Sequence, residues 1–218
     1  MNELDELLPS PGSDTPLPGV AIGVVTSNAD PEHLGRVKVR FPAVSETVES
    51  TWAPVMTPMA GNERGLQMLP EAGDTVVVAF EQGDVNRPFV LGGFWNAAQH
   101  PPEGDSAGNA VRLIRSRSGH AIRLDDTDGA ELIQIVDKSG KNTITIDTAT
   151  NKITVHAAGP ITVAADGDLE LTATGDLKLE GRQVKVAANL KLSLSGQQGA
   201  ELTSTGPLVV RGSTVDIN

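Results

Sequence analysis

Few residues of this chain could do metal or thiolate chemistry, and their spacing does not favour it. The chain has no cysteine, which excludes disulfides, thiolate catalysis and the usual zinc clusters. None of its four histidines belongs to an H-x-H or H-x-x-x-H pair, so we expect no metal site. The histidines are His33, His100, His120 and His156.

The run Asp125-Asp126-Thr127-Asp128-Gly129 has the look of a calcium loop. Such a loop needs a bidentate glutamate at a fixed later position. Glu131 comes too early for that role, and the next acid is Asp137. We therefore expect this run to form a turn between two strands.

Ser116, Ser118 and His120 are the nearest approach to a nucleophile and its base. No strand-to-helix elbow surrounds the serines, so we expect no catalytic residue. The glycines of the first half lie at turns, which argues against a phosphate loop, and no cofactor is expected. The arginine-rich stretch 112–123 either binds polyanions or balances neighbouring acids.

Composition divides the chain into two halves. All aromatic residues lie at or before residue 95, so the halves have different interiors. Residues 1–110 hold 5 basic and 15 acidic side chains, a balance that disfavours nucleic acid and anionic lipid as partners. No signal peptide or bilayer-spanning apolar run is evident, and we expect a soluble protein or part of a soluble assembly.

The first half predicts a small all-β barrel. Residues 1–18, rich in proline and acids, are expected to be a flexible arm, and 97–110 a linker. Residues 19–96 contain five short β-rich runs separated by turn signals, among them Asn28-Ala29-Asp30-Pro31. Closure of five strands removes exposed edges, which favours an OB-type barrel. The runs are 19–26, 35–41, 52–56, 75–80 and 88–95.

The second half, 111–218, repeats a unit of two apolar residues flanking one polar residue. Successive pairs start 11, 11 and 9 residues apart, and then 7 or 8, which is strand-plus-turn spacing. The predicted inward residues are Ile122, Leu124, Ile133, Ile135, Ile144, Ile146, Ile153, Val155, Ile161, Val163, Leu169, Leu171, Leu177, Leu179, Val184, Val186, Leu192, Leu194, Leu202, Leu208, Val210, Val215 and Ile217.

A rung with two inward residues cannot bury them alone, and two arrangements satisfy the repeat. One chain can coil as a solenoid of about 24 residues per turn, or three chains can wind together. A solenoid predicts preferences that recur at every third rung, whereas here Ile, Leu and Val run in blocks. The blocks favour a homotrimer with an intertwined triple-stranded β-helix and these residues as its core.

These residues resemble the central spike proteins of contractile phage tails and related contractile injection systems. The resemblance covers most of the chain. It is carried by Leu34-Gly35-Arg36-Val37-Lys38-Val39, Gly73-Asp74, Phe80-Glu81, Gly83-Asp84, Arg87-Pro88, Arg117-Ser118-Gly119-His120, Asp125-Asp126-Thr127, Gly129-Ala130-Glu131, Lys138-Ser139-Gly140 and the rungs.

The resemblance implies a non-enzymatic spike that is driven through a target envelope, touching the membrane only transiently. Residues 1–18 are too short for the hub domains of some relatives, so a separate trimeric hub protein is expected at the barrel. A lysozyme domain does not fit into 97–110. A conical, PAAR-type tip protein is expected at the other end, contacting Thr214, Val215, Asp216, Ile217 and Asn218. The location implied is a phage tail baseplate or an injection particle, assembled in the bacterial cytoplasm.

Two other function classes fit parts of the pattern. An OB-fold module that binds oligonucleotides or polysaccharides could carry a trimerising stalk, but single-strand binding needs basic and aromatic faces. A polysaccharide lyase or hydrolase on a β-solenoid needs a groove with paired carboxylates or arginines. The chain offers single charges on alternating faces instead.

Overall fold

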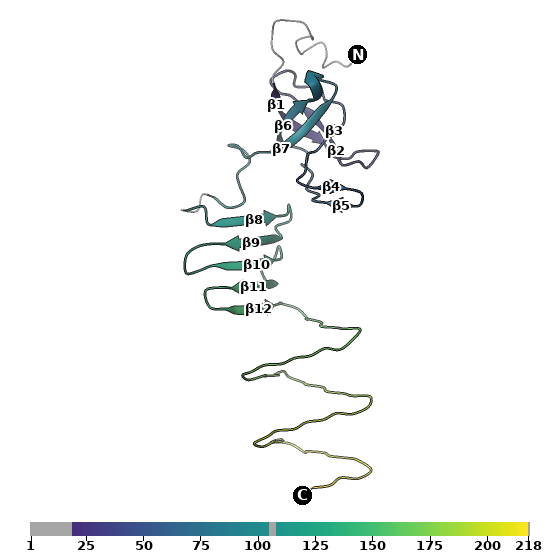
Figure 1. The fold of residues 1–218 in the computed structure, drawn as a ribbon, viewed down its shortest axis with the longest axis vertical. Coiled ribbons are helices and arrows are strands. Elements are labelled where there is room, and N and C mark those ends of the chain that lie inside the picture. Colours follow the sequence, from purple (N-terminus) through teal and green to yellow (C-terminus); the bar gives the residue numbers. More distant parts are fainter. Residues whose placement is uncertain (1–18, 105–107, 218) are drawn as a thin grey trace. The chain divides into compact units, whose positions relative to one another are not determined.

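The computed structural model describes residues 19–104 and 108–217, and its regular structure is nearly all β (Figure 1). The predicted arm 1–18, part of the linker, and Asn218 lie outside the described residues. The chain divides into two compact units, one up to Ile161 and one from Thr162. The first unit contains two five-stranded sheets, and the second contains no assigned strand among its described residues.

The first sheet confirms the five strands predicted for the barrel. Its spatial order is β3-β2-β1-β6-β7, with antiparallel pairing throughout. The long strand β1 pairs with both β2 and β6, which bends the sheet toward closure. The bounds are β1 Val20–Ser27, β2 Arg36–Arg40, β3 Ala53–Pro54, β6 Thr75–Phe80 and β7 Pro88–Gly93.

The two ends of this sheet meet beside β3. Val55 forms a parallel bridge with Val90, and the backbone N–H of Met56 donates to the Val90 carbonyl at 2.8 Å. A five-stranded antiparallel barrel closed by one parallel contact is the OB arrangement. The domain is therefore a nearly closed OB barrel.

Alternation along the strands places one set of side chains inside the barrel. Phe41 packs against Phe80 with ring centroids 5.7 Å apart. Gly23 lets β1 and β2 approach closely, because a Cβ there would lie 2.2 Å from a methyl carbon of Val39. The buried core is Val25, Val37, Val39, Phe41, Ala53, Val76, Val78 and Val90.

Two local features complete the barrel. A hairpin of β4 (Ala60–Gly61) and β5 (Arg64–Gly65) was not expected, because two-residue strands leave no periodicity to detect. The tight turn predicted between β6 and β7 is a short 3₁₀ turn, η1 (Glu81–Gly83).

Asp30 holds the β1–β2 turn together from a buried position. Its carboxylate accepts hydrogen bonds from Arg36 Nε at 2.9 Å and Nη2 at 2.8 Å, and from the backbone N–H groups of Glu32 and Leu34. The Arg36 guanidinium is the main reason that the pKa of Asp30 lies well below its ordinary value. The predicted turn at Asn28–Pro31 therefore carries the most buried ion pair among the described residues of the barrel.

The second sheet is an antiparallel meander in the order β12-β11-β10-β9-β8. The repeat predicts one continuous series of rungs over 111–218, but the first five strands pair within one chain. Connections of four to six residues reverse the chain each time. The bounds are β8 Val111–Arg115, β9 Ala121–Asp125, β10 Leu132–Val136, β11 Thr143–Asp147 and β12 Lys152–His156.

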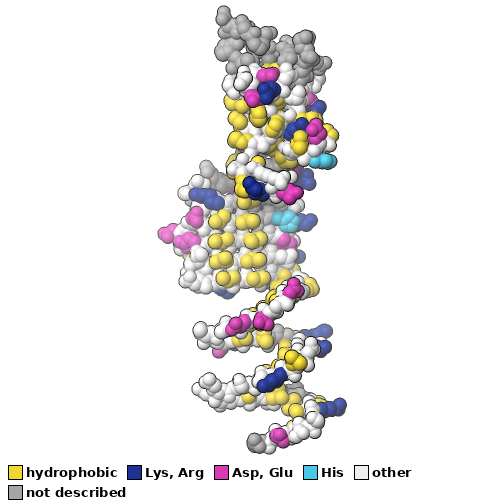
Figure 2. Space-filling model, turned by 45° about the vertical axis from the view of Figure 1, so that its right-hand side comes forward, with side chains coloured by type: hydrophobic (Ala, Val, Ile, Leu, Met, Phe, Trp, Pro, Cys, Tyr) yellow, Lys and Arg dark blue, Asp and Glu magenta, His cyan; other side chains and the backbone are white. Residues whose placement is uncertain are grey.

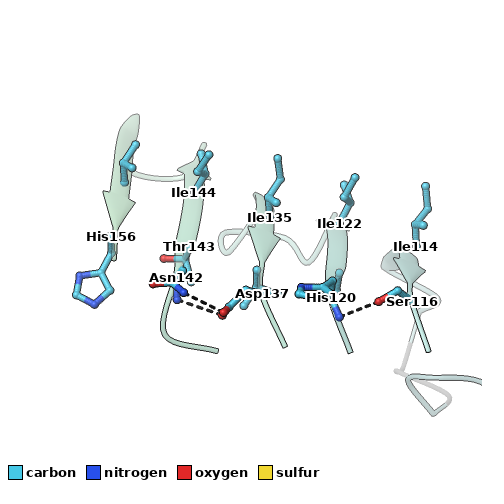
Figure 3. Close-up of a pocket in the computed structure, with 13 residues that line it drawn as sticks. Ile114, Ser116, His120, Ile122, Ile135, Asp137, Asn142, Thr143, Ile144 and His156 are labelled. Carbon is cyan, nitrogen blue, oxygen red and sulfur yellow. Dashed lines mark hydrogen bonds between the residues drawn. The ribbon is translucent and has the colours of Figure 1, made fainter. Parts of the chain in front are cut away.

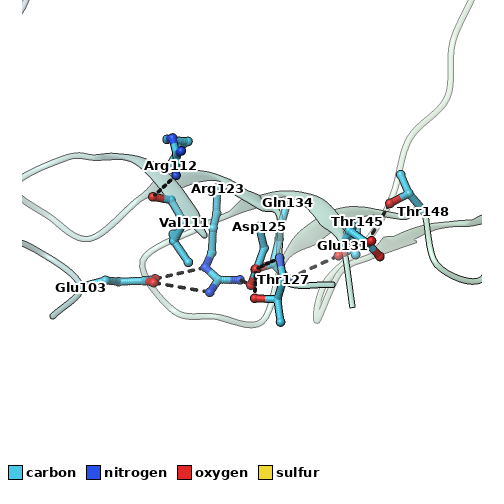
Figure 4. A network of polar contacts seen from close by, with 10 residues as sticks. All are labelled: Glu103, Val111, Arg112, Arg123, Asp125, Thr127, Glu131, Gln134, Thr145 and Thr148. Atoms are coloured by element: carbon cyan, nitrogen blue, oxygen red, sulfur yellow. Dashed lines mark hydrogen bonds and ion pairs between the residues drawn. The ribbon is translucent and has the colours of Figure 1, made fainter. Parts of the chain in front are cut away.

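Carboxylates and left-handed residues build these reversals. The Asp125 carboxylate accepts from the backbone N–H and hydroxyl of Thr127, so the calcium-like run is a turn, as predicted (Figure 4). The Ser139 hydroxyl, followed by Asn142, lowers the pKa of Asp137 to about 2. Gly129 and Gly140 adopt φ values of 73° and 70°, which a residue with a Cβ rarely takes.

Residues 162–217 follow an extended path without internal strand pairing. Figure 1 shows an open coil whose successive turns stand apart. None of the described residues after Asn151 has a positive φ, so the hairpin reversals end there. No backbone-to-backbone hydrogen bond is found among the described residues of this unit. Its strand-forming groups are left without partners in a single chain.

We predict that Asp30→Asn lowers the melting temperature of the barrel by roughly 5 °C or more, because Arg36 loses its charged partner. Thermal unfolding followed by tryptophan fluorescence measures this, since Trp52 and Trp95 both lie in the barrel domain. The pair stabilises the fold above pH 3.8, so the difference from wild type should narrow as pH falls below that value.

The matched control is Glu32→Gln, which removes a carboxylate that pairs with Arg36 at 3.0 Å but is largely exposed. Its melting temperature should stay close to wild type. Equal losses for the two variants would contradict the role assigned to Asp30.

Candidate functional site: an assembly interface

One face of the second sheet is lined by large apolar side chains, and Arg112 of β8, opposite Leu124, is the one charged residue in its rows. The strand register aligns them in rows: Ile135 lies opposite Ile122 and Ile144, and Ile133 lies opposite Leu124 and Ile146. We call this surface the isoleucine face. Its members are Ile114, Ile122, Leu124, Ile133, Ile135, Ile144, Ile146, Ile153 and Val155.

The isoleucine face is uncovered in the single chain. Its side chains are between 37% (Ile146) and 69% (Ile153) exposed, whereas Val76 and Val78 of the barrel core are fully buried. Figure 2 shows the apolar rows across the sheet. A contiguous apolar patch of this kind on a soluble protein marks an interaction surface.

The opposite face of the same sheet mixes charged and polar side chains with apolar ones, and its polar contacts are made within the chain. Arg123 pairs with Glu103 of the linker at 3.2 Å and with Asp125 at 2.6 Å (Figure 4). These acids, Glu103 first, raise the pKa of Arg123. Gln134 donates to the Thr145 hydroxyl across the neighbouring strands at 3.4 Å. The guanidinium of Arg123, within the arginine-rich stretch, therefore pairs with acids of the same chain and is not available to bind a polyanion.

A shallow pocket lies at one edge of the isoleucine face, and Ser116 and His120 are among the residues that line it (Figure 3). Ser116 Oγ accepts the backbone N–H of His120 at 3.0 Å and contacts the Ser118 hydroxyl at 3.3 Å. His120 Nδ1 accepts the backbone N–H of Lys138 at 3.2 Å. The serines and the imidazole thus tie turns together, and they do not form a nucleophile–base pair.

The geometry adds little chemistry elsewhere. Within residues 19–104 and 108–217, no three His, Asp or Glu side chains are grouped so as to hold a metal ion. No helix in the same ranges is long and apolar enough to cross a bilayer. The isoleucine face and the unpaired backbone are therefore suited to association with another protein surface.

The predicted core residues beyond β12 extend the same character into the second unit. From Ile161 to Ile217 they range from 47% (Val215) to 89% (Ile217) exposed. Extended backbone of this kind presents N–H and C=O groups without backbone partners, and such groups can pair with the edge of another strand. Sequence reasoning found both sets of residues, but it missed Ile114 of β8, whose row partner is Ile122.

A second apolar surface lies on the outside of the barrel. Neighbouring strands β1, β6 and β7 carry it, with Val20 opposite Ala79 and Ala79 opposite Phe89. Val20, Ile22, Phe89 and Leu91 are between 36% and 59% exposed. We call it the outer barrel patch: Val20, Ile22, Val77, Ala79, Phe89 and Leu91.

Comparison with known families identifies the barrel. Residues 21–95 match the model of the type VI secretion system and phage-baseplate injector OB domain. The resemblance seen in the sequence is thereby confirmed for the barrel.

Three curated relatives align with part of the chain. The type VI secretion system spike protein VgrG3 of Vibrio cholerae is 30% identical over 42% of this chain and 9% of its own length. The spike protein VgrG1a of Pseudomonas aeruginosa is 32% identical over 50% of this chain and 18% of its own length. The actin cross-linking toxin VgrG1 of Vibrio cholerae is 30% identical over 43% of this chain and 9% of its own length. The chain thus spans less than a fifth of each.

We predict that Ile135→Glu reduces the mass in solution to that of one chain, 22.7 kDa, because burying a carboxylate in an apolar contact between copies is prohibitive. Light scattering coupled to size exclusion measures this. Gln134→Glu is the matched control: it adds the same charge one residue away, on the opposite face beside Arg123, and should leave the mass of the assembly unchanged. Loss of assembly in both variants would mean that the isoleucine face is not the interface.

Proposed function

Because residues 21–95 match the injector OB domain of type VI secretion systems and phage baseplates, we propose that the chain is the central spike of a contractile tail or injection particle. In this proposal three copies form a rigid, non-enzymatic shaft that crosses a target envelope when the sheath contracts. The observation that carries the proposal is that the chain has an uncovered isoleucine face and, after it, a coil without strand partners among its described residues.

Three meander sheets can cover one another's isoleucine faces. A symmetric trimer turns the three faces toward one axis and leaves the opposite faces, with their ion pairs, toward water. The five strands of each sheet bring one row of five aliphatic side chains and one row of four that ends at Arg112. The interior is then a stack of aliphatic side chains bounded by Arg112, whose guanidinium donates to the backbone carbonyls of Asn109 and Val111. This arrangement removes the apolar surface that a single chain exposes.

Residues 162–217 complete the same shaft in another way. The strand edges of one coil have no backbone partners among the described residues, so they are open to the strands of two further chains. Each rung would then be hydrogen-bonded on both edges, which a single chain does not achieve. Layers about 4.8 Å apart place these hydrogen bonds along the long axis of the shaft. A load along that axis then acts on many hydrogen bonds in series, and no chain can separate without breaking its pairing with the other two.

The outer barrel patch is the surface we assign to a separate hub protein. Its exposed side chains are uncharged, so its partner should present a matching apolar surface. The partner assigned to the other end is a conical tip protein that contacts residues 214–218, of which Asn218 lies outside the described residues.

The geometry gives little support to an oligonucleotide-binding barrel. Outward-facing Arg36, Lys38 and Arg40 of β2 are the natural phosphate ligands of such a face, but each pairs with carboxylates. Arg36 pairs with Asp30 and Glu32, Lys38 with Glu49 at 3.4 Å, and Arg40 with Glu46. The positive charges on the outer face of β2 are thus neutralised by carboxylates of the same chain.

The proposal is tested on contractile particles assembled with the wild-type chain, Ile135→Glu or Gln134→Glu. After triggered contraction, particles with wild type or Gln134→Glu should release dye from target-cell envelopes, and those with Ile135→Glu should not. Equal release from particles with Ile135→Glu would refute the spike function.

A further prediction concerns the hub. Ile22→Asp, 59% exposed in the outer barrel patch, should reduce co-purification of the hub protein at least about tenfold while the chain keeps its assembled mass. Leu34→Asp is the control, since Leu34 is 65% exposed but lies outside the patch. Unchanged hub binding by Ile22→Asp would place the hub contact elsewhere.

A further inference from the structure

Two opposite charges occupy the same position in consecutive rungs of the second unit. Glu170 lies between Leu169 and Leu171, and Lys178 lies between Leu177 and Leu179. Because side chains alternate along an extended strand, both point away from the apolar pairs that flank them. They are eight residues apart, which is one rung.

Neither charge has an ionic partner among the residues that the structure describes. Among the described residues of 162–217 no ion pair is formed, and Glu170 accepts only the hydroxyl of nearby Thr172, at 3.1 Å. Both side chains are exposed. Their partners must come from another molecule or from solvent.

Threefold symmetry decides which rungs become neighbours. It places the same rung of all three chains at one height, on three different sides of the shaft. Each chain moves to the next side and one layer down with every rung. On any one side, therefore, a rung of one chain lies directly above the following rung of its neighbour.

We propose that Glu170 of each chain forms an ion pair with Lys178 of the neighbouring chain, and that this contact specifies how the three chains interleave. The inference rests on the three-chain shaft proposed above. Residues directly opposite on adjacent strands lie about 5 Å apart at Cβ, within reach of a Glu–Lys pair. A chain slipped by one rung would instead place Glu170 beside Glu170 and Lys178 beside Lys178 at one of its two interfaces.

The next rung makes the proposal sharper. Lys185 holds the same middle position as Lys178, one rung later, so Lys178 lies between an attractive and a repulsive neighbour. Glu170→Lys replaces the attraction with a second repulsion. Lys178→Glu exchanges the two interactions and leaves their sum unchanged. The double exchange, Glu170→Lys with Lys178→Glu, makes both contacts attractive.

A self-coiled solenoid predicts different neighbours. With three rungs per turn, Lys178 would lie over Glu201 and Glu170 over Ser193. Glu201 is therefore the matched control: it has the same charge in the same kind of position, and in the interleaved shaft its neighbours are the uncharged Ser193 and Val209.

The experiment measures thermal unfolding of the full chain by far-ultraviolet circular dichroism at low salt, with tryptophan fluorescence reporting the barrel separately. Glu170→Lys should melt several degrees below wild type, Lys178→Glu close to it, and the double exchange above it. Glu201→Lys should match wild type. Added salt at 0.5 M should shrink all differences.

Additive effects in the double exchange would overturn the proposed ion pair, and so would a loss in Glu201→Lys with none in Glu170→Lys. A wild-type mass of 22.7 kDa, rather than about 68 kDa for three chains, would instead refute the spike shaft itself. The two failures are thus distinguishable.

Discussion

The constraint on which the rest of the structure depends is that one chain leaves its strand edges and apolar rows unsatisfied. Backbone N–H and C=O groups removed from water must be paired. Residues 162–217 offer them no partner among the described residues, and the apolar pairs along the same path are exposed. An assembly of several copies resolves both deficits at once, because strands from other chains bring hydrogen bonds and apolar side chains together.

The structure of the first unit is compatible with the proposed assembly. The meander satisfies its own inner edges through hairpins built by Asp125, Asp137 and left-handed glycines, so only its isoleucine face and end strands remain open. On its opposite face Arg123 forms an ion pair with Glu103 of the linker. The reversals then end at Asn151, and the chain passes from pairing with itself to a path without backbone partners among the described residues. Stability near the barrel therefore comes from within the chain, and in the proposed shaft the stability of residues 162–217 comes from association.

The sequence predicts the barrel strands well, because Val-rich alternation in β1, β2 and β6 has one clear solution. It does not predict the contact between Val55 and Val90, a long-range pairing with no local signal. In the second half it identifies the apolar pairs but not their antiparallel pairing. The signal was present in the spacing: 11, 11 and 9 residues leave room for a hairpin turn, whereas 8 residues leave room only for a corner.

The most direct measurement is amide hydrogen exchange over residues 162–217 of the full chain in dilute solution. If three chains interleave, the rung amides are hydrogen-bonded to neighbours and should resist exchange for hours, although one chain alone offers them no backbone partner. Exchange of these amides within seconds, at the rate of an unstructured peptide, would contradict the account.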